Sequence, residues 1–493
     1  MRRRRFLFLL FIFLSYVPVL AQVDTGWIRR YNGPGNDGDF AYALAVDDSG
    51  NVYVTGESVG SGSSYDYVTI KYSANGDTLW ARRYNGPAND YDVATAIAVD
   101  GDGNVYVTGH SWGGLSTDFA TVKYTPNGDT LWVRRYNGPG NLGDGGSALA
   151  VDDSENVYVT GISWSGTSSD YTTIKYAPNG DTLWVRWYNG PGNGEDMASS
   201  LAVDNYGDVY ITGWSLGNGT NSDYATLKYA PNGDTLWVRR YNGPGNLGDG
   251  GSALAVDDSG SVYVTGISWN GTSSDYTTIK YAPNGDTLWV RQYNGPGNDY
   301  DYGSSLVVDV SGNVYVTGRS GGSGTSDDYA TALALDTSGN IYVTGLSVGI
   351  GTSDDYATIK YAPNGDILWV RLYNGLGNDY DVATALGVDG RQNVYVTGYS
   401  WGIGTLQNYV TIKYNKFGCA AKAGDANSDY KVNLSDIIFK VNYVFKGGAR
   451  PDPLCSGDDN ADNEVNLPDI IYLVNFVFKG GPGPLNSNEC CLE

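Results

Sequence analysis

The chain has 493 residues, of which 54 are acidic and 31 are basic, so its formal net charge at neutral pH is −23. Such a surface repels nucleic acids and anionic lipids, which argues against partners of either kind. The single histidine, His110, excludes an active site that uses several histidines and argues against any histidine-based site.

Residues 1–21 have the three parts of a secretory signal peptide. Four arginines follow Met1, an apolar stretch runs from Phe6 to Leu20, and the segment ends at Ala21 in a small-residue cleavage pattern. About 15 apolar residues fall short of the roughly 20 that a membrane-spanning helix needs. We therefore expect no membrane span and a mature bacterial protein, starting near Gln22, that is secreted or held at the cell surface. A retained signal anchor is the alternative.

Residues 22–414 are built from repeats of roughly 52 residues. Each repeat has four short segments rich in Val, Tyr, Thr, Ile and Trp, separated by turns that contain Gly, Asn or Pro. This pattern predicts a β-propeller with one four-stranded sheet per repeat. The motif Trp-x-Arg-x-Tyr-Asn-Gly marks the repeats and begins at Trp27, Trp80, Trp132, Trp184, Trp237, Trp289 and Trp369.

A second motif, Ala-x-Ala-Val-Asp-x-x-Gly-Asn-Val-Tyr-Val-Thr-Gly, recurs eight times, first at residues 43–56 and last at 385–398, where Gly387 replaces an alanine. Over residues 27–414 the chain thereby resembles the bacterial seven-bladed β-propeller repeat family (SBBP). The resemblance implies that the Ala-Val-Asp strand lines the central channel and that the Trp-x-Arg-x-Tyr strand lies outermost.

The two ends of the repeat region complement each other. Residues 27–31 form an outer strand with no inner strands before it, whereas residues 384–414 lack an outer strand. We expect these ends to complete one blade together, because pairing them removes two exposed sheet edges.

The last interval between tryptophan motifs is longer than the others, because a half-repeat is duplicated. Residues 304–330 and 331–357 align without gaps and are identical at 18 of 27 positions. The chain thus has eight inner strands and seven outer ones. We favour about seven four-stranded blades with one inserted two-stranded piece over eight true blades, although partial deletion from an eight-bladed ancestor fits the same sequence.

The propeller offers no clear catalytic set. A repeated Asp-Tyr pair, as at Asp66, is explained by a carboxylate that caps a turn. Loops such as residues 294–301 add acids and aromatic rings that could stack on sugars, but Tyr and Trp also fill propeller cores. Near-identical blades offer no unique carboxylate pair, and His110 with Glu195 and Asp196 forms no recognisable nucleophile and base. A non-catalytic propeller is favoured, with an enzyme as the alternative.

After a linker at residues 415–423, two acidic loops of twelve residues follow each other at an interval of 33 residues. Oxygen-bearing side chains occupy loop positions 1, 3, 5, 9 and 12, and the carbonyl at position 7 completes the EF-hand pattern. The sequence therefore predicts two calcium ions. The expected ligands are Asp425, Asn427, Asp429, Lys431, Asn433 and Asp436 in the first loop, and Asp458, Asn460, Asp462, Glu464, Asn466 and Asp469 in the second.

Each loop leads into an apolar segment with helical spacing, residues 437–446 and 470–479, which a Gly-Gly pair ends. Asn433 and Asn466 can cap these helices. The loop and helix, present twice, resemble a type I dockerin over residues 424–485. That family binds cohesin domains through loop positions 10 and 11, which are here Leu434, Ser435, Leu467 and Pro468.

All four cysteines, Cys419, Cys455, Cys490 and Cys491, lie near the C-terminus, the last two in a tail at residues 486–493. Export permits disulfides, but the sequence does not choose among the three possible pairings.

The sequence as a whole predicts an all-β propeller followed by a small α-helical, EF-hand-like dockerin domain. The expected function is that of a secreted, non-catalytic binding and assembly protein. Its propeller would be the interaction platform, and its tail would attach through calcium to a cohesin-type or cell-surface partner. A carbohydrate-binding or polysaccharide-degrading component is the alternative.

Overall fold

The computed structural model describes residues 25–321, 328–348, 353–415, 426, 432, 434–448, 451, 457–459, 464–479 and 482. The chain divides into two compact units, of which the first contains Trp27–Lys413 and the second Tyr414–Glu493. The expected signal peptide and all four cysteines lie outside the described residues, and so do seven of the twelve expected calcium ligands. Within the described residues, no helix is long and apolar enough to cross a membrane.

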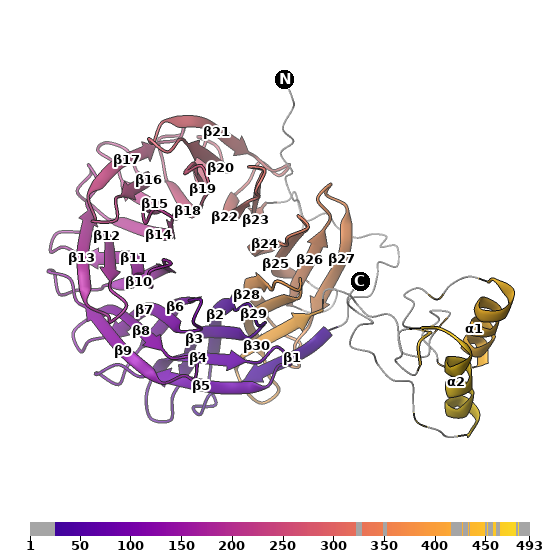
Figure 1. Ribbon diagram of the computed structural model, residues 1–493. Coiled ribbons are helices and arrows are strands. Elements are labelled where there is room, and N and C mark those ends of the chain that lie inside the picture. The colour runs from indigo at the N-terminus through magenta and orange to yellow at the C-terminus, as the bar shows by residue number, and fades with distance from the viewer. Residues whose placement is uncertain are drawn as a thin grey trace. The chain divides into compact units, whose positions relative to one another are not determined.

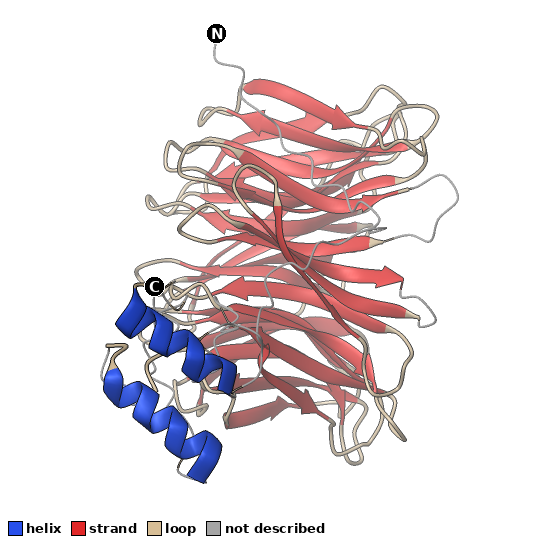
Figure 2. Cartoon of the chain, turned by 90° about the vertical axis from the view of Figure 1, so that its right-hand side faces the viewer, coloured by secondary structure: helices blue, strands red, loops and turns tan. Residues whose placement is uncertain are grey.

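The first unit is an all-β propeller, in which thirty described strands form seven sheets around a channel (Figure 1). The Ala-Val-Asp strands lie next to the channel and the tryptophan strands lie outermost, as the sequence predicts. Seen from the side in Figure 2, the strands of successive blades run across the thickness of the propeller.

The inner strands are β2 (Asp39–Val46), β6 (Asp92–Val99), β10 (Gly145–Val151), β14 (Asp196–Val203), β18 (Asp249–Val256), β22 (Asp301–Val308), β24 (Tyr329–Leu335) and β28 (Asp381–Val388). The second strands are β3 (Val52–Val59), β7 (Val105–Trp112), β11 (Val157–Trp164), β15 (Val209–Leu216), β19 (Val262–Trp269), β23 (Val314–Ser320), β25 (Ile341–Val348) and β29 (Val394–Trp401). The third strands are β4 (Tyr65–Tyr72), β8 (Thr117–Tyr124), β12 (Ser169–Tyr176), β16 (Ser222–Tyr229), β20 (Ser274–Tyr281), β26 (Asp354–Tyr361) and β30 (Gln407–Tyr414). The outer strands are β1 (Thr25–Tyr31), β5 (Thr78–Tyr84), β9 (Thr130–Tyr136), β13 (Thr182–Tyr188), β17 (Thr235–Tyr241), β21 (Thr287–Tyr293) and β27 (Ile367–Tyr373).

The hydrophobic clusters of the propeller lie between neighbouring blades. One of them joins Tyr53, Tyr67 and Trp80 to the strands of the next blade. The Tyr67 hydroxyl donates to the Ala120 carbonyl at 3.1 Å, and the Trp80 indole donates to the Pro126 carbonyl at 3.0 Å. Because these contacts recur from blade to blade, most of the abundant tyrosine and tryptophan serves packing and is not free to bind a ligand.

The predicted closure between the two ends of the repeat region is confirmed. Strand β1 completes a sheet in the order β1-β30-β29-β28, so the first strand of the chain pairs with the last. Trp27 is 8% exposed, and its indole donates to the Ala74 carbonyl of the next blade at 3.1 Å. Equivalent bonds to the next blade are made by Trp80, Trp132, Trp184 and Trp237.

The duplicated half-repeat forms a half-blade, which confirms the favoured interpretation of the long interval. Six sheets have four strands and the seventh has six, in the order β22 to β27. Strands β23 and β24 pair only at Arg319 and Tyr329. The Ser304 hydroxyl of β22 donates to the Ala330 carbonyl of β24 at 2.6 Å, a contact that elsewhere links the inner strands of neighbouring blades. Among the described residues, the propeller therefore has eight inner strands and seven outer ones.

The described residues of the second unit form two helices of equal length, α1 (Leu434–Lys446) and α2 (Leu467–Lys479). They pack through Ile437, Ile470 and Leu473. Each helix begins directly after the asparagine that the sequence proposes as its cap, and Gly447 ends α1 with a positive φ of 66°. The two helices are the expected ones, and they begin three residues earlier than the apolar segments.

Candidate functional site

The structure describes five of the twelve expected calcium ligands. Asp436 and Asp469 lie in the first turns of α1 and α2 and are fully buried, and Asp458 is 2% exposed. The Asp469 carboxylate accepts the backbone N–H groups of Asp459 and Asn466, each at 2.9 Å. Buried carboxylates at these positions fit a calcium ion, because hard oxygens without water need a cation to offset their charge.

The other described ligands are Glu464 and Asn466, whose side chains contact each other, with the Asn466 amide 3.3 Å from the Glu464 carboxylate. Among the described residues alone, no three His, Cys, Asp or Glu side chains converge to hold a metal. The remaining expected ligands, which lie outside the described residues, are Asp425, Asn427, Asp429, Lys431, Asn433, Asn460 and Asp462.

A buried ion pair links the two copies of the loop and helix. The sequence interpretation did not predict this ion pair. The Lys440 amine of α1 lies 2.5 Å from the Asp459 carboxylate, and both side chains are fully buried. Burial raises the pKa of the Asp459 carboxyl, and the Lys440 charge opposes that rise. Asp459 is not at a ligand position, so this pair holds the second loop against the first helix.

The four residues expected to contact a partner are all exposed at the starts of the two helices. Leu434 is 50% exposed and Leu467 is 48% exposed, and Ser435 and Pro468 beside them are exposed as well. Further exposed apolar pairs follow at equivalent positions of the helices: Ile438 with Ile471, each at 52%, and Phe445 with Phe478, each at 60%.

In the propeller, the repeated Asp-Tyr pair has a structural role, as the sequence suggests. The Asp66 carboxylate accepts the Ser63 hydroxyl at 2.9 Å and pairs with Arg83 at 2.8 Å. Asp118 and Asp223 form the same ion pair with the arginine of their own outer strand. These carboxylates hold the loop between the second and third strands, and the arginine contact is an addition to the predicted turn cap.

A second set of aspartates, at the start of the inner strands, is fully buried and bonded to backbone. The Asp92 carboxylate accepts the Gly86 N–H at 2.6 Å and the Trp112 N–H at 3.1 Å. Burial raises the pKa of this group above its ordinary value, and its hydrogen bonds only partly oppose that rise. The same holds at Asp39, Asp144, Asp196, Asp249 and Asp381.

These raised pKa values predict that mild acid stabilises the propeller. A carboxyl whose folded pKa lies above its unfolded value binds a proton first in the native state, so the free energy of unfolding rises as pH falls towards the ordinary aspartate range. We expect the melting temperature, measured by circular dichroism, to rise by a few degrees when the pH is lowered from 7 to 5. The rise should persist in about 1 M salt, which screens surface repulsion but not buried groups. A fall in melting temperature over this range would contradict the expectation.

One cluster of side chains breaks the symmetry of the blades. The Tyr42 hydroxyl donates to Glu57 Oε1 at 2.7 Å, and the Tyr91 hydroxyl also hydrogen-bonds to this carboxyl. Glu57 is only 5% exposed, and burial raises the pKa of its carboxyl. In the other seven inner strands the position of Tyr42 is serine or threonine, and in the other second strands the position of Glu57 is never acidic.

Aromatic rings surround this carboxyl. The ring centroid of Phe40 lies 6.2 Å from that of Tyr65 and 5.0 Å from that of Tyr399. Tyr91 lies 5.7 Å from Tyr65 and 5.7 Å from His110. We call this group the Glu57 cluster; its members are Phe40, Tyr42, Glu57, Tyr65, Tyr91, His110 and Tyr399. The sequence interpretation did not name this cluster, and a comparison of equivalent repeat positions would have found it.

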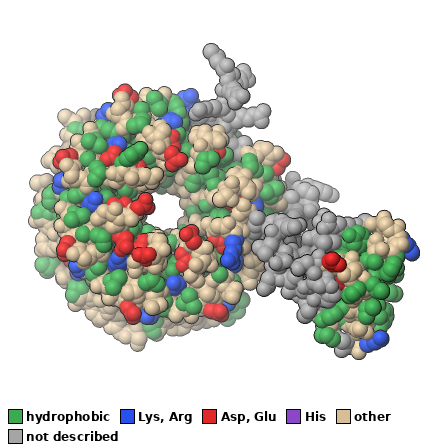
Figure 3. All heavy atoms as spheres, viewed as in Figure 1, with side chains coloured by type: hydrophobic (Ala, Val, Ile, Leu, Met, Phe, Trp, Pro, Cys, Tyr) green, Lys and Arg blue, Asp and Glu red, His purple; other side chains and the backbone are tan. Residues whose placement is uncertain are grey.

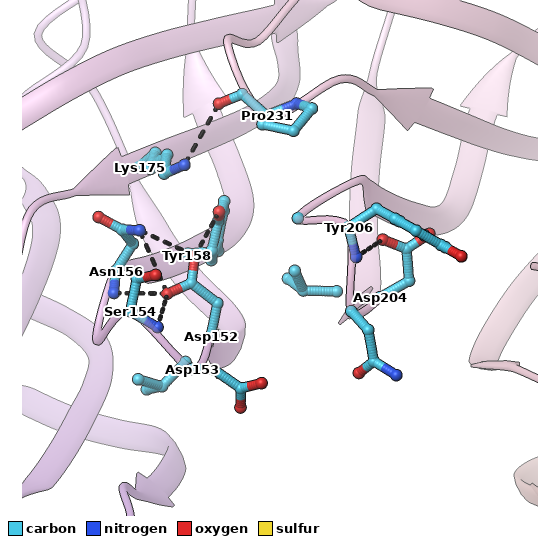
Figure 4. Close-up of a pocket in the computed structure, with 13 residues that line it drawn as sticks. Asp152, Asp153, Ser154, Asn156, Tyr158, Lys175, Asp204, Tyr206 and Pro231 are labelled. Carbon is cyan, nitrogen blue, oxygen red and sulfur yellow. Dashed lines mark hydrogen bonds between the residues drawn. The ribbon is translucent and has the colours of Figure 1, made fainter. Parts of the chain in front are cut away.

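A pocket of about 420 Å³ lies where the turn after β10 faces the turn after β14 (Figure 4). Its polar base is already hydrogen-bonded: the Asp152 carboxylate accepts the Tyr158 hydroxyl at 2.9 Å, and the Lys175 amine donates to the Pro231 carbonyl at 3.2 Å. Tyr206 replaces the serine found in most equivalent turns and is 83% exposed. An aromatic face beside a polar pocket is therefore open to solvent. Figure 3 also shows acidic side chains gathered around the mouth of the channel.

Four segments of the chain match the Beta-propeller repeat family, SBBP: residues 26–62, 79–116, 288–324 and 321–350. An uncharacterized WD repeat-containing protein of Acanthamoeba polyphaga mimivirus is 27% identical over 30% of this chain and 14% of its own length. The matching region thus spans only about a seventh of that relative.

Several solved structures are similar at low identity. The polysaccharide lyase Uly1 is 12% identical with a TM-score of 0.43, over 77% of this chain and 90% of its own. The β-propeller domain of the Trilobed protease from Pyrococcus furiosus is 9% identical with a TM-score of 0.42, over 76% and 98%. Drosophila Plexin A in complex with Semaphorin 1b is 10% identical with a TM-score of 0.41, over 83% and 90%. Similarity at this level does not bear on function.

Proposed function

We propose that this chain is a secreted, non-catalytic binding and assembly protein. Its first unit is a seven-bladed β-propeller with SBBP-type repeats. In this proposal the propeller is an interaction platform. The second unit is a dockerin-like tail that binds two calcium ions and attaches the protein to a cohesin-type domain or a cell-surface scaffold.

The observation that carries the proposal is the burial of Asp436, Asp458 and Asp469 at the expected ligand positions. Lys440 contributes one positive charge to this region, and it pairs with a fourth buried carboxylate, Asp459. A unit with so small a core gains little from burying the other carboxylates unless a further cation offsets their charge. Calcium would be held there by the oxygen ligands of the two loops, and when bound it would supply the charge that lets these carboxylates remain inside the unit.

The exposed apolar residues support the attachment role. Leu434 and Leu467 begin two equivalent stripes, one on each helix, which continue through Ile438 and Ile471. Exposed apolar surface repeated in this way is typical of a protein-binding face. Retention of the full chain on a cohesin-bearing resin, in calcium and in chelator, tests the role directly. Retention that did not depend on calcium would contradict it.

A second function, carbohydrate binding by the propeller, is favoured by the pocket beside Tyr206. Aromatic faces next to a few polar groups are typical of sites that orient a small polar ligand, and the exposed ring could stack on a sugar. Asp153 and Asn205 line the same pocket and could contact its hydroxyl groups.

Replacement of Tyr206 by serine tests this second function. Serine occupies the same turn position at Ser49, Ser154 and Ser259, so Tyr206→Ser should fold normally. We expect the variant to lose at least about tenfold in affinity for any saccharide that the full chain binds on a glycan array, because stacking is lost. Equal binding by both proteins, or no saccharide bound by the wild type, would remove carbohydrate binding at this pocket.

A further inference from the structure

Burial of the Glu57 carboxylate destabilises the folded propeller. Its carboxyl is buried and receives hydrogen bonds from the Tyr42 and Tyr91 hydroxyls, but no Lys or Arg of the described residues pairs with its charge. A buried charge without a partner destabilises a protein, and an apolar residue in its place is neutral or stabilising. The equivalent positions of two other blades hold Ile162 and Ile267, which shows that the repeat accepts an apolar residue there. A group kept at such a cost is typical of a functional site.

The charges around Glu57 favour a cationic ligand. Asp37 and Asp39 lie close enough to act, with Glu57, on the pKa of Tyr65. His110 is the one member of the cluster that could carry a positive charge, but burial lowers its pKa and keeps it neutral at pH 7. An anion would be repelled, whereas a cation would meet several negative groups.

The aromatic rings favour an organic cation over a metal ion. A single carboxylate is too few oxygens for calcium, which takes six to eight. The rings of Tyr65 and Tyr91 lie edge to face at 79°, and those of Phe40 and Tyr399 at 72°, so the faces of the rings point in different directions. Ring faces attract ammonium groups, most strongly where water is excluded.

We propose that the Glu57 cluster binds an organic ammonium ion, with the carboxylate as its counter-ion and the rings as its walls. The inference rests on the binding role proposed for the propeller and gives that role a ligand class. Tyr91 is the most exposed ring of the cluster, at 39%, and lies on the loop between β5 and β6. Because the Tyr91 hydroxyl hydrogen-bonds to Glu57, a ligand that pairs with the carboxylate would have to displace it.

Choline and its uncharged carbon isostere, dimethylbutanol, are the probes for this site. Each is titrated into the full chain, and binding is followed by calorimetry and by ligand-observed NMR. We expect saturable binding of choline and at least about tenfold weaker binding of the isostere, because only choline carries a charge. Choline should also raise the melting temperature of the wild type by mass action.

Two variants separate ligand binding from folding. Glu57→Gln keeps the size of the side chain and removes its charge, and Glu57→Ile restores the residue of two other blades. Both should melt no lower than the wild type and should bind choline at least about tenfold more weakly. Absence of saturable choline binding, equal binding of choline and isostere, or unchanged binding by Glu57→Gln would each overturn the ammonium site. Calcium uptake by the second unit is a separate measurement, so failure here is distinguishable from failure of the attachment role.

Discussion

Deletion of residues 22–36 should strongly destabilise the propeller, because it removes the strand that closes the ring. Strand β1 is the outer strand of the sheet β1-β30-β29-β28 and pairs with β30. Trp27 packs there with Tyr395 and Tyr409 in one hydrophobic cluster. Loss of one buried tryptophan costs about 3–5 kcal/mol, and the deletion removes its strand pairing as well. We expect a clear drop in the melting temperature of the propeller, measured by calorimetry.

The deletion should also change the association state of the protein. Removing β1 leaves the edge of β30 unpaired, and unpaired edges recruit other chains. Size-exclusion chromatography with light scattering should therefore show dimers or larger species. A monomer with an unchanged melting temperature would show that β1 does not close the ring.

Two tryptophan variants provide the matched comparison. Trp27→Ala removes the closing ring without removing the strand and should cost about 3–5 kcal/mol. Trp289 occupies the same repeat position beside the half-blade, where it is only partly buried. Trp289→Ala should therefore cost less than Trp27→Ala, because less apolar surface is lost. A loss at Trp27 no larger than the loss at Trp289 would show that ring closure does not bury Trp27.

The fold of the propeller could be predicted because each repeat meets nearly the same surroundings. A pattern such as that of residues 43–56 specifies one hairpin, and eight copies of it specify the ring. The half-blade was also visible, since the duplication at residues 304–357 lacks one tryptophan strand. Sequence alone did not show how the half-blade contacts the next inner strand, because the Ser304 contact to Ala330 depends on the finished ring.

The Glu57 cluster was missed because its members are distant in sequence. Phe40 and Tyr399 meet only after the ring has closed, and Tyr91 comes from the blade that follows Glu57. The available signal was the departure of Tyr42 and Glu57 from the residues at equivalent positions of the other repeats. Repetition drew attention to the shared residues, whereas the unusual chemistry lies in the exceptions.

The ion pair between Lys440 and Asp459 was missed for a related reason, since it joins two copies that were read separately. At the equivalent positions of the other copies stand Leu473 and Ala426, which are also buried. The two copies therefore differ at both positions together: one combination is the charged pair Lys440 and Asp459, and the equivalent combination is the apolar pair Leu473 and Ala426. Such a paired exchange between copies predicts contact, and the structure confirms the charged contact.

Removal of calcium should unfold the second unit while the propeller remains intact. The cluster between the two helices has three buried apolar residues, Ile437, Ile470 and Leu473, which is a small core to offset the entropy of ordering both helices. At calcium concentrations 100 times the Kd, each bound ion would add about 2.7 kcal/mol to its stability. Chelator should therefore lower the helical signal in circular dichroism and remove one of two calorimetric transitions.

The double variant Asp425→Ala with Asp458→Ala should abolish the calcium response and leave the propeller transition unchanged, because each substitution removes the first ligand of one loop. The control replaces two exposed propeller aspartates, Asp48→Ala with Asp102→Ala, and should still bind two ions. The wild-type chain is titrated with its cysteines oxidised and again with them reduced, because a disulfide could stabilise the unit in place of the metal. If calorimetry detected no calcium uptake in either state, the loops would not be calcium sites, and the proposed attachment through the second unit would have to be abandoned.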